Sequence, residues 1–374
     1  MNSVKCIKLR LKEPTKRKKE KINKFMTISK DIANFTCNRM HSFPDYRYKT
    51  QGDNTWYRIV KDIRNDYAIN AMIVNEIVQK VRTSFASWKT NNGKEKPKFK
   101  NATWIPYRKN IKFFKKDNRF YISLPFESGR GSREVFPIVN NDYFNYFVKN
   151  FIDEKINYGS GELVKHNGDY YFHISIKKEV DLDYEPKTFI GVDLGLNVIA
   201  WAVAINSEGK FLDEIHFDGG QAGWVRDRYF KKRKRLQEEG NMSMVKKIKD
   251  RESRWMENMN NKISRRIVDF ASNFEKPIIL LEDININDLR KRHGKENPKL
   301  HSWGAGNLRD MIEYKALEKG IKTKLINPKF TSQKCPKCNV INKNNRKGIE
   351  FKCRTCGYEN HADFIGATNI ANRG

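Results

Sequence analysis

Short apolar runs without polar interruptions predict buried strands in the second half of the chain. One run covers residues 189–192 and ends at Asp193, a second covers 198–205, and a third covers 277–281 and ends at Glu282. Aliphatic runs of this length fit strands that are buried on both faces of a sheet. A carboxylate is a poor core residue, so each acid is expected where its strand leaves the core. The pattern therefore predicts Asp193 and Glu282 side by side at one rim of a sheet.

A spacing of three to four residues between apolar positions predicts two long amphipathic helices in the first half. The apolar positions are Ile22, Phe25, Ile28, Ile32 and Phe35 in the first helix, and Ile69, Ile73, Ile77, Val81, Phe85 and Trp88 in the second. Residues 94–180 are expected to be rich in strands, with turns at Asp117-Asn118 and Asn167-Gly168. An alternating run at residues 4–12 predicts one further strand before the first helix.

Residues 224–274 combine a helical pattern with many basic residues, and Gly240-Asn241 interrupts them. This pattern predicts two helices joined as a hairpin, inserted between the strands that end at Asp193 and Glu282. A charged run on a helix is usually a solvated face, and that interpretation stays open. The alternative is that the hairpin binds phosphates close to the rim where the carboxylates are expected.

The charge balance predicts a polyanionic partner. The 374 residues include 74 Lys and Arg against 44 Asp and Glu, a net charge of +30. Nucleic acid is the first candidate and an anionic membrane the second. No run of 18 or more apolar residues is present, which disfavours a membrane. A hydrophobic content of 38% is too high for a disordered basic tail, so a folded nucleic-acid-binding protein is expected.

Basic clusters mark the candidate contacts with nucleic acid. They lie at the start of the first helix, along the predicted hairpin and near the last cysteines. The candidate residues are Lys16, Arg17, Lys18, Lys231, Lys232, Arg233, Arg235, Arg265 and Arg354.

Four of the six cysteines form two Cys-x-x-Cys pairs, Cys335 with Cys338 and Cys353 with Cys356, separated by 14 residues. Each such pair bends so that both thiolates face one ion, and the spacing predicts a tetrahedral, structural Zn²⁺ site. In a basic chain of this kind disulfides are disfavoured. The two isolated cysteines, Cys6 and Cys37, are expected to be inert core residues.

A third carboxylate, Asp363, lies in the last apolar stretch of the chain. Carboxylates held close together repel unless they share a proton or bind a cation. Oxygen ligands suit Mg²⁺ or Mn²⁺. An isolated Asp after a strand is more often a turn or cap residue, so the metal hypothesis depends on Asp193, Glu282 and Asp363 acting together.

These motifs, in this order, resemble the transposon-encoded TnpB proteins. The resemblance rests on Gly191–Gly195, Leu281–Ile284, Tyr314–Ala316 with Gly320-Ile321, Asn327–Cys338, Cys353–Gly357 and Ala362–Ile370, and it covers about residues 188–374. Asp193 begins a stretch similar to the first strands of the RuvC nuclease fold, a relative of ribonuclease H. Glu282 and Asp363 resemble the second and third motifs of that fold. The chain departs from the family pattern at Ile365 and Gly366, where Asn and Ala are frequent.

The resemblance implies an α/β plus β architecture: an RNase H-like RuvC nuclease domain with an inserted zinc ribbon, preceded by an oligonucleotide-binding-like β-barrel (the wedge) that carries a helical recognition lobe. The implied boundaries are residues 1–14 for the first wedge strand, 15–93 for the helical lobe, 94–185 for the rest of the wedge, 186–330 for the nuclease domain with its basic insertion at 224–274, 331–358 for the target-binding zinc ribbon, and 359–374 for the third nuclease motif.

The resemblance also implies an RNA-guided DNA endonuclease that acts in the prokaryotic cytoplasm, at the nucleoid. Such an enzyme binds a guide RNA, recognises a short motif beside its target DNA, and cuts through a site holding two Mg²⁺ or Mn²⁺ ions. The implied catalytic residues are Asp193, Glu282 and Asp363. Three alternatives remain: a compact type V CRISPR effector with the same chemistry, a guide-free RuvC nuclease, and a non-enzymatic guided repressor. Retention of all three carboxylates argues against the repressor.

Overall fold

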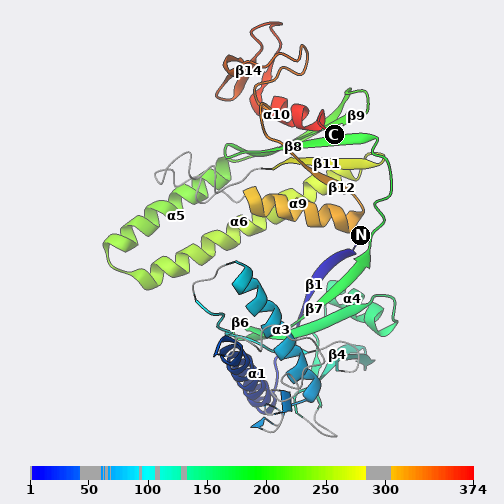
Figure 1. Cartoon of the computed structure of the whole chain (residues 1–374), viewed down its shortest axis with the longest axis vertical. Helices are drawn as coiled ribbons and strands as arrows, with labels where there is room; N and C mark the ends of the chain where they lie inside the picture. Colours follow the sequence, from blue (N-terminus) through cyan, green and yellow to red (C-terminus); the bar gives the residue numbers. More distant parts are fainter. Residues whose placement is uncertain are drawn as a thin grey trace. The chain divides into compact units, whose positions relative to one another are not determined.

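The protein is represented by a computed structural model, which describes residues 2–42, 69–91, 95–105, 110–127, 133–283 and 305–374, together with residues 60, 61, 63, 66 and 67. The chain divides into two compact units, residues 2–178 and 179–374 (Figure 1). Each unit has its own hydrophobic core.

Two long helices of the first unit confirm the helical spacing in the sequence. Helix α1 covers Lys16–Ser42 and helix α3 covers Ala71–Thr90. The apolar stripe of α3 is buried through Ile73, Ile77 and Val81, none of which is exposed to solvent. Asn70 caps α3, since its side chain accepts a hydrogen bond from the N–H of Met72 at 3.0 Å. The two helices therefore bury the faces that their sequences predict.

The described strands of the first unit form two antiparallel sheets. The four-stranded sheet has the order β1 (Asn2–Arg10), β7 (Asp169–Glu179), β6 (Tyr158–His166) and β2 (Trp104–Ile105), and the three-stranded sheet has the order β3 (Lys112–Lys116), β4 (Arg119–Pro125) and β5 (Arg133–Pro137). Both predicted turns are present, at Asp117-Asn118 and at Asn167-Gly168, with positive φ at all four residues. A bridge between Leu11 and Ile138 connects the two sheets.

One helix interrupts the region that the sequence analysis expected to be strand-rich. Helix α4 covers Asp142–Ile152, and Asn141 caps it by accepting from the N–H of Phe144 at 2.8 Å. It buries Phe147, Val148 and Phe151, and Phe151 lies four residues after Phe147 and three after Val148. The helical period was therefore present in the sequence, inside a segment dominated by strand patterns.

The second unit is built on a five-stranded sheet with the order β10 (Phe211–Asp218), β9 (Val198–Asn206), β8 (Thr188–Leu194), β11 (Pro277–Glu282) and β12 (Lys322–Ile326). Strand β9 is antiparallel to β8 and β10, whereas β11 is parallel to β8 and β12. Because β8 and β11 are parallel neighbours, their carboxyl ends meet at the same rim. This topology confirms the predicted placement of the two strand ends.

Helices cover both faces of this sheet (Figure 1). Helices α6 (Met242–Ala271) and α9 (Ala305–Lys319) pack on the face that presents Ile190, Val192, Ile279 and Leu281. Helix α10 (Ala362–Ala371) packs on the other face, against Trp201, Val203, Ile205, Ile278 and Leu280. Burial on both faces explains why the strands read as unbroken apolar runs.

The predicted basic hairpin is present as α5 (Gly220–Glu238) followed by α6. Gly240 lies between the two helices with φ of +68°, a conformation that favours glycine. The hairpin ends at Ala271, three residues before the predicted limit. No helix among the described residues is long and apolar enough to cross a membrane.

Candidate carboxylate and cysteine sites

Three carboxylates from three elements interact electrostatically at the rim of the second unit's sheet. Asp193 is the next-to-last residue of β8, Glu282 is the last residue of β11, and Asp363 lies in the first turn of α10. Desolvation raises the pKa of Asp193 well above its ordinary value, and the nearby charges of Glu282 and Asp363 raise it further. Desolvation also raises the pKa of Glu282. The three acids therefore form one coupled group.

Hydrogen bonds from the loop after β12 orient Glu282. The Thr331 hydroxyl donates to Glu282 Oε1 at 2.6 Å. The amide of Asn369, on α10, donates to the carbonyl oxygens of Thr331 and Lys334, both at 2.7 Å. Helix α10, which carries Asp363, thus also holds the loop that positions Glu282.

Arg346 is a fourth member of the group and was not among the residues predicted from the sequence. Its Nη2 lies 3.1 Å from Asp363 Oδ1, and its charge lowers the pKa of both Asp193 and Glu282. Arg346 belongs to β13 (Arg346–Lys347), between the two cysteine pairs. No local pattern distinguishes it from the many other basic residues of this segment, so only its position in the fold reveals it.

His361 fixes the start of α10. Its Nδ1 accepts a hydrogen bond from the N–H of Asp363 at 3.2 Å, and its ring stacks on Trp201 with 4.7 Å between centroids. Trp201 also stacks on His216, and its indole N–H donates to Glu214 at 3.0 Å. The backbone of the Asp363 turn is therefore anchored to β9 and β10.

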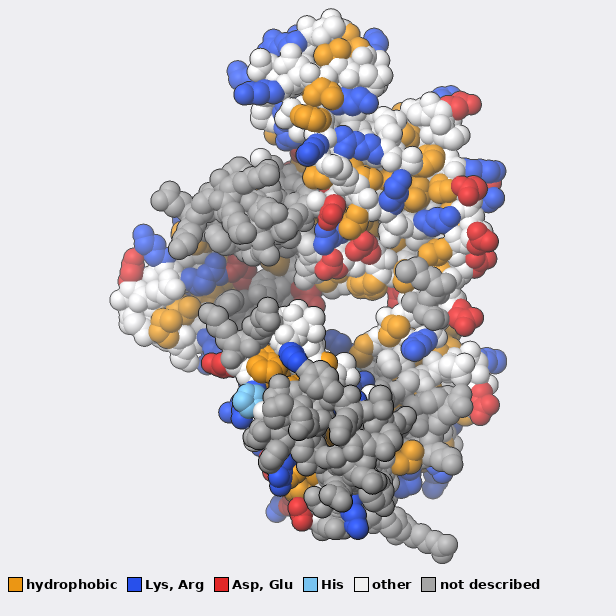
Figure 2. All heavy atoms as spheres, in the orientation of Figure 1, with side chains coloured by type: hydrophobic (Ala, Val, Ile, Leu, Met, Phe, Trp, Pro, Cys, Tyr) orange, Lys and Arg blue, Asp and Glu red, His pale blue; other side chains and the backbone are white. Residues whose placement is uncertain are grey.

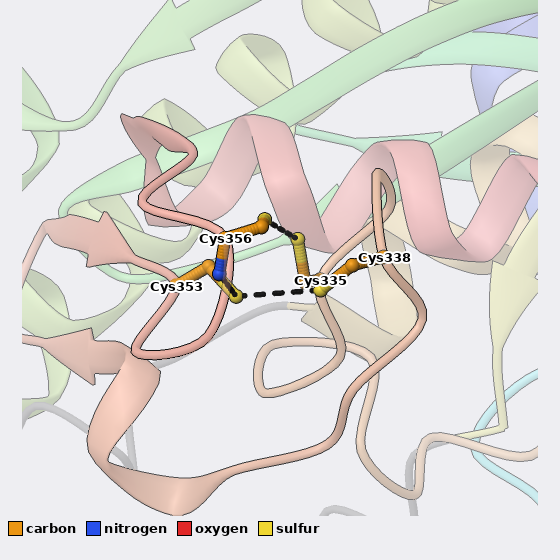
Figure 3. A group of neighbouring side chains, drawn as sticks. All are labelled: Cys335, Cys338, Cys353 and Cys356. Carbon is orange, nitrogen blue, oxygen red and sulfur yellow. Dashed lines mark hydrogen bonds between the residues drawn. The ribbon is translucent and has the colours of Figure 1, made fainter.

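The four paired cysteines converge on one point (Figure 3). Among the described residues they are the one group of three or more metal-ligating side chains whose ligand atoms lie together, all within 4.8 Å. The sulfur atoms of Cys335 and Cys356 are 3.6 Å apart, and those of Cys338 and Cys353 are 3.5 Å apart. Zn–S bonds of about 2.3 Å in a tetrahedron give sulfur separations of about 3.8 Å. The cluster therefore fits one tetrahedral ion.

The backbone beside the second cysteine pair favours the thiolate form of Cys353. The N–H of Cys356 points at the sulfur of Cys353 at 3.5 Å, and this interaction is the main cause that lowers the pKa of Cys353 to about 6. Strands β13, β14 (Glu350–Lys352) and β15 (Glu359–His361) form a small antiparallel sheet around the second pair. β15 leads directly into α10, so the cysteine cluster adjoins the carboxylate group in the chain.

Parts of this chain are similar to known proteins. Residues 306–370 match the family model described as "Cas12f1-like, TNB domain". The CRISPR-associated endodeoxyribonuclease Cas12f1 of Sulfoacidibacillus thermotolerans is 30% identical over 51% of this chain and 49% of that protein. A TnpB-like protein of Methanocaldococcus jannaschii is 24% identical over 62% of this chain and 84% of that protein.

The chain is a relative of the TnpB-like proteins and of the Cas12f1 proteins. A solved Cas12f1–sgRNA–target DNA complex matches 96% of this chain and 83% of that chain, with a TM-score of 0.73 and 15% identity. The likeness shows that this TnpB and Cas12f1 relative has the fold of a compact type V effector. The chain spans about half the length of the Sulfoacidibacillus protein and 66% of a Cas12f1 from Syntrophomonas palmitatica.

Two residues depart from the pattern of the TnpB family, and both contact the sites. Ile365 is fully buried in a cluster with Cys335, Phe351 and Cys353, so it joins α10 to the cysteine ribbon. A Cβ atom added at Gly366 would overlap the carboxylate of Asp193. The absence of a side chain at position 366 therefore lets Asp193 lie directly against α10.

The predicted contacts with nucleic acid occupy varied environments in this TnpB and Cas12f1 relative. Several already have partners within the chain: Arg17 with Glu134, Lys18 with the carbonyl of Val135, Lys231 with Asp227, Arg233 with Glu252, Arg235 with Glu239, and Arg354 with the carbonyl of Asn344. Lys16 and Lys232 are exposed, and Arg265 is half-buried. Their role in binding stays a prediction.

The prediction for Cys6 was wrong. Cys37 is buried as expected, but Cys6 is exposed. Cys6 lies on β1, where side chains alternate between faces, and its neighbour Ile7 takes the buried face. A small hydrophobic residue in a strand is not always part of the core.

Proposed function

We propose that this chain is an RNA-guided DNA endonuclease of the TnpB type, which binds a guide RNA and cuts DNA beside a short flanking motif. The observation that carries the proposal is the coupled group of Asp193, Glu282 and Asp363 at one sheet rim, in a chain related to TnpB-like and Cas12f1 proteins. The strand order, with β8 central and β9 antiparallel to it, supports an RNase H-like RuvC domain.

The carboxylate group fits divalent cations. Burial and the nearby charges of Glu282 and Asp363 raise the pKa of Asp193, so ionisation of all three acids is opposed by charge repulsion, which cations relieve. Three carboxylates from three elements would be the ligands of two such ions, as in other two-metal sites. Bound Mg²⁺ or Mn²⁺ supplies the Lewis acidity that activates water and stabilises the leaving 3′ oxygen.

The protein's own groups have separable roles in this proposal. Asp193, whose carboxylate interacts electrostatically with both other acids, is the candidate bridging ligand, while Thr331 orients Glu282 and His361 orients the Asp363 turn. Arg346, freed from Asp363 when cations bind, would contact an oxygen of the scissile phosphate. Cleavage is expected to leave 5′ phosphates.

The remaining parts of the chain would hold the nucleic acids. The four cysteines would bind a structural Zn²⁺ whose four sulfur ligands leave no open position. Residues 1–14 and 94–185 are proposed as the wedge, 15–93 as the recognition lobe and 331–358 as the target-binding ribbon. Sequence would be read by pairing between guide and target, and the protein would hold the heteroduplex by its backbone.

The decisive experiment begins with the purified protein and any RNA that copurifies with it. A discrete RNA species, together with Mg²⁺-dependent cleavage of a DNA that matches its variable end, is the expected result. Cleavage of branched DNA without RNA would instead identify a guide-free nuclease. Guided binding without cleavage at any Mg²⁺ concentration would identify a repressor, which leaves the three carboxylates without a role.

A further inference from the structure

The α5–α6 hairpin carries a pocket to which the proposed function assigns no role. Its volume is about 300 Å³, and it lies between the two helices. The lining residues are Trp224, Val225, Arg228, Tyr229, Lys232, Ile248, Arg251 and Trp255. Figure 2 shows basic and hydrophobic side chains beside one another on this hairpin, which projects from the sheet in Figure 1.

Apolar, aromatic and cationic side chains line different parts of the pocket. Val225 and Ile248 are 6% and 2% exposed and form an apolar floor. Three aromatic rings line the walls, and the indole of Trp224 is unusually open, with 61% of its surface exposed. Three cations complete the lining, and no carboxylate is among the described lining residues. Aromatic faces beside cations suit a flat, electron-rich group attached to an anion.

The cations around this pocket differ from their neighbours on the same helices. Lys231, Arg233 and Arg235 all form ion pairs with acids of the hairpin. Within the described part of the chain, Arg228, Lys232 and Arg251 have no ion-pair partner. Positive charge without a described ion-pair partner therefore lines the pocket, where a ligand's negative charge would be stabilised.

The spacing along α5 places the ring and two of the charges on one helix face. Positions 224, 228 and 232 are four residues apart, so their side chains lie in a row. The guanidinium of Arg228 lies over the Trp224 ring, 5.1 Å from its centroid. Arg251 faces this row from α6. The arrangement offers an aromatic stacking surface with cations beside it.

We propose that this pocket binds one unpaired nucleotide of RNA, with its base stacked on Trp224 and its phosphates at Arg228, Lys232 and Arg251. The proposal rests on the proposed function, which supplies the RNA. RNA presents unstacked bases in loops and bulges, and proteins hold them on aromatic and guanidinium planes. A duplex does not fit, because a pocket at the lower end of the range of about 300–1,000 Å³ for small-molecule sites has room for one nucleotide.

The test uses the full-length protein and the RNA that copurifies with it. Trp224→Ala should raise the dissociation constant for that RNA about tenfold, the loss expected for one stacked base. Trp224→Phe should restore most of the affinity, because a phenyl ring still stacks. Arg251→Gln should weaken binding and reduce the slope of log affinity against log salt by about one. In the Trp224→Ala complex, one nucleotide of the RNA should become more reactive to chemical probing.

Matched controls lie on the same two helices. Phe230 is an aromatic residue of α5 with 42% exposure, and Arg254 is an exposed cation of α6; neither lines the pocket. Phe230→Ala and Arg254→Gln should therefore leave RNA affinity within about twofold of the parent protein, the scatter expected of substitutions outside a binding site. Thermal unfolding of each variant reports on its fold.

Three outcomes would overturn the pocket assignment. Unchanged RNA affinity in both Trp224→Ala and Arg251→Gln would do so, and intact guided cleavage by the parent protein would show that the proposed function still stands. Weaker binding of single-stranded DNA with unchanged RNA affinity would assign the pocket to DNA. Equal losses in the control variants would show a general charge or folding effect. Absence of both copurified RNA and guided cleavage in the parent protein would instead remove the proposed function itself.

Discussion

At the scale of single residues, the charged side chains at the rim of the five-stranded sheet affect one another's ionisation. Desolvation and two neighbouring acids raise the pKa of Asp193, while Arg346 lowers it. The site is therefore arranged to attract cations, and each acid is expected to influence the others. The coupling bears on cleavage activity, on stability and on the pH dependence of cleavage.

Asp193→Ala should separate cutting from binding. With Glu282 and Asp363 alone, two ions cannot be held in register, so cleavage should fall by several orders of magnitude, roughly a thousandfold or more. Guided binding should be nearly unchanged, because it depends on basic surfaces elsewhere. Cleavage and gel-shift assays on the same RNA-loaded protein measure both. Loss of binding together with cleavage would show that Asp193 supports the fold instead.

Asp193→Asn should stabilise the protein in the absence of divalent cations. A carboxyl group whose folded-state pKa is raised binds its proton more tightly in the folded state than in the unfolded state. Its ionisation therefore destabilises the fold, and the penalty grows as pH rises through the unfolded-state pKa and towards the folded one. At neutral pH in EDTA, the free energy of unfolding of Asp193→Asn should therefore exceed that of the parent protein. The gain should vanish near pH 4, and an equal gain there would contradict the electrostatic origin.

The same coupling predicts how cleavage responds to pH. Because the acids must be ionised to bind cations and the pKa values of Asp193 and Glu282 are raised, activity should fall as pH is lowered, beginning at a higher pH than ordinary carboxyl groups would give. Arg346 lowers the pKa of both Asp193 and Glu282, so Arg346→Gln should move the acid limb of the pH–rate profile upward. Arg346→Lys keeps the charge and should move it less. An unshifted profile in Arg346→Gln would contradict the role assigned to this side chain.

At the scale of elements, direct contacts hold the cysteine ribbon and α10 together. β15 leads directly into α10, Ile365 packs among the cysteines, and Arg346 reaches from the ribbon to Asp363. The ribbon's order should therefore determine the position of the third carboxylate.

Cys335→Ser should release the proposed Zn²⁺ and also reduce cleavage. Structural zinc contributes on the order of 10 kcal/mol to the folding of a small module, so the ribbon should unfold locally. Metal analysis and cleavage assays measure both effects, with Cys6→Ser as the control, since Cys6 is exposed and remote from the cluster in the chain. Absence of zinc from the parent protein would refute the site.

At the scale of the whole molecule, the net charge of +30 should dominate association with nucleic acid. Affinity for RNA should fall by roughly a thousandfold or more between about 50 and 200 mM salt, because each phosphate contact releases counterions. A filter-binding titration across this range measures the slope. A flat titration would show that charge does not drive binding, whatever the pockets contribute.

Several features were predictable from the sequence because their causes are local. Apolar runs buried on both faces, the positive-φ turns at Asp117-Asn118 and Asn167-Gly168, and the spacing of Cys335 and Cys338 each depend on a few consecutive residues. The parallel pairing of β8 with β11 was also within reach, since two similar runs ending in acids favour adjacent strand ends. The resemblance to TnpB proteins extended these local signals to the order of the motifs.

The tertiary structure alone decided what depends on residues distant in the chain. Arg346 forms an ion pair with Asp363 because the ribbon folds back on α10, and no pattern in the neighbouring sequence predicts this contact. Exposure of Cys6 follows from the face that β1 presents to its core. Lys231 and Lys232 are adjacent in the sequence, yet only Lys231 has a described ion-pair partner, because their side chains point in different directions around α5. Sequence patterns determine which elements form, whereas contacts among elements decide which charges remain available to a ligand.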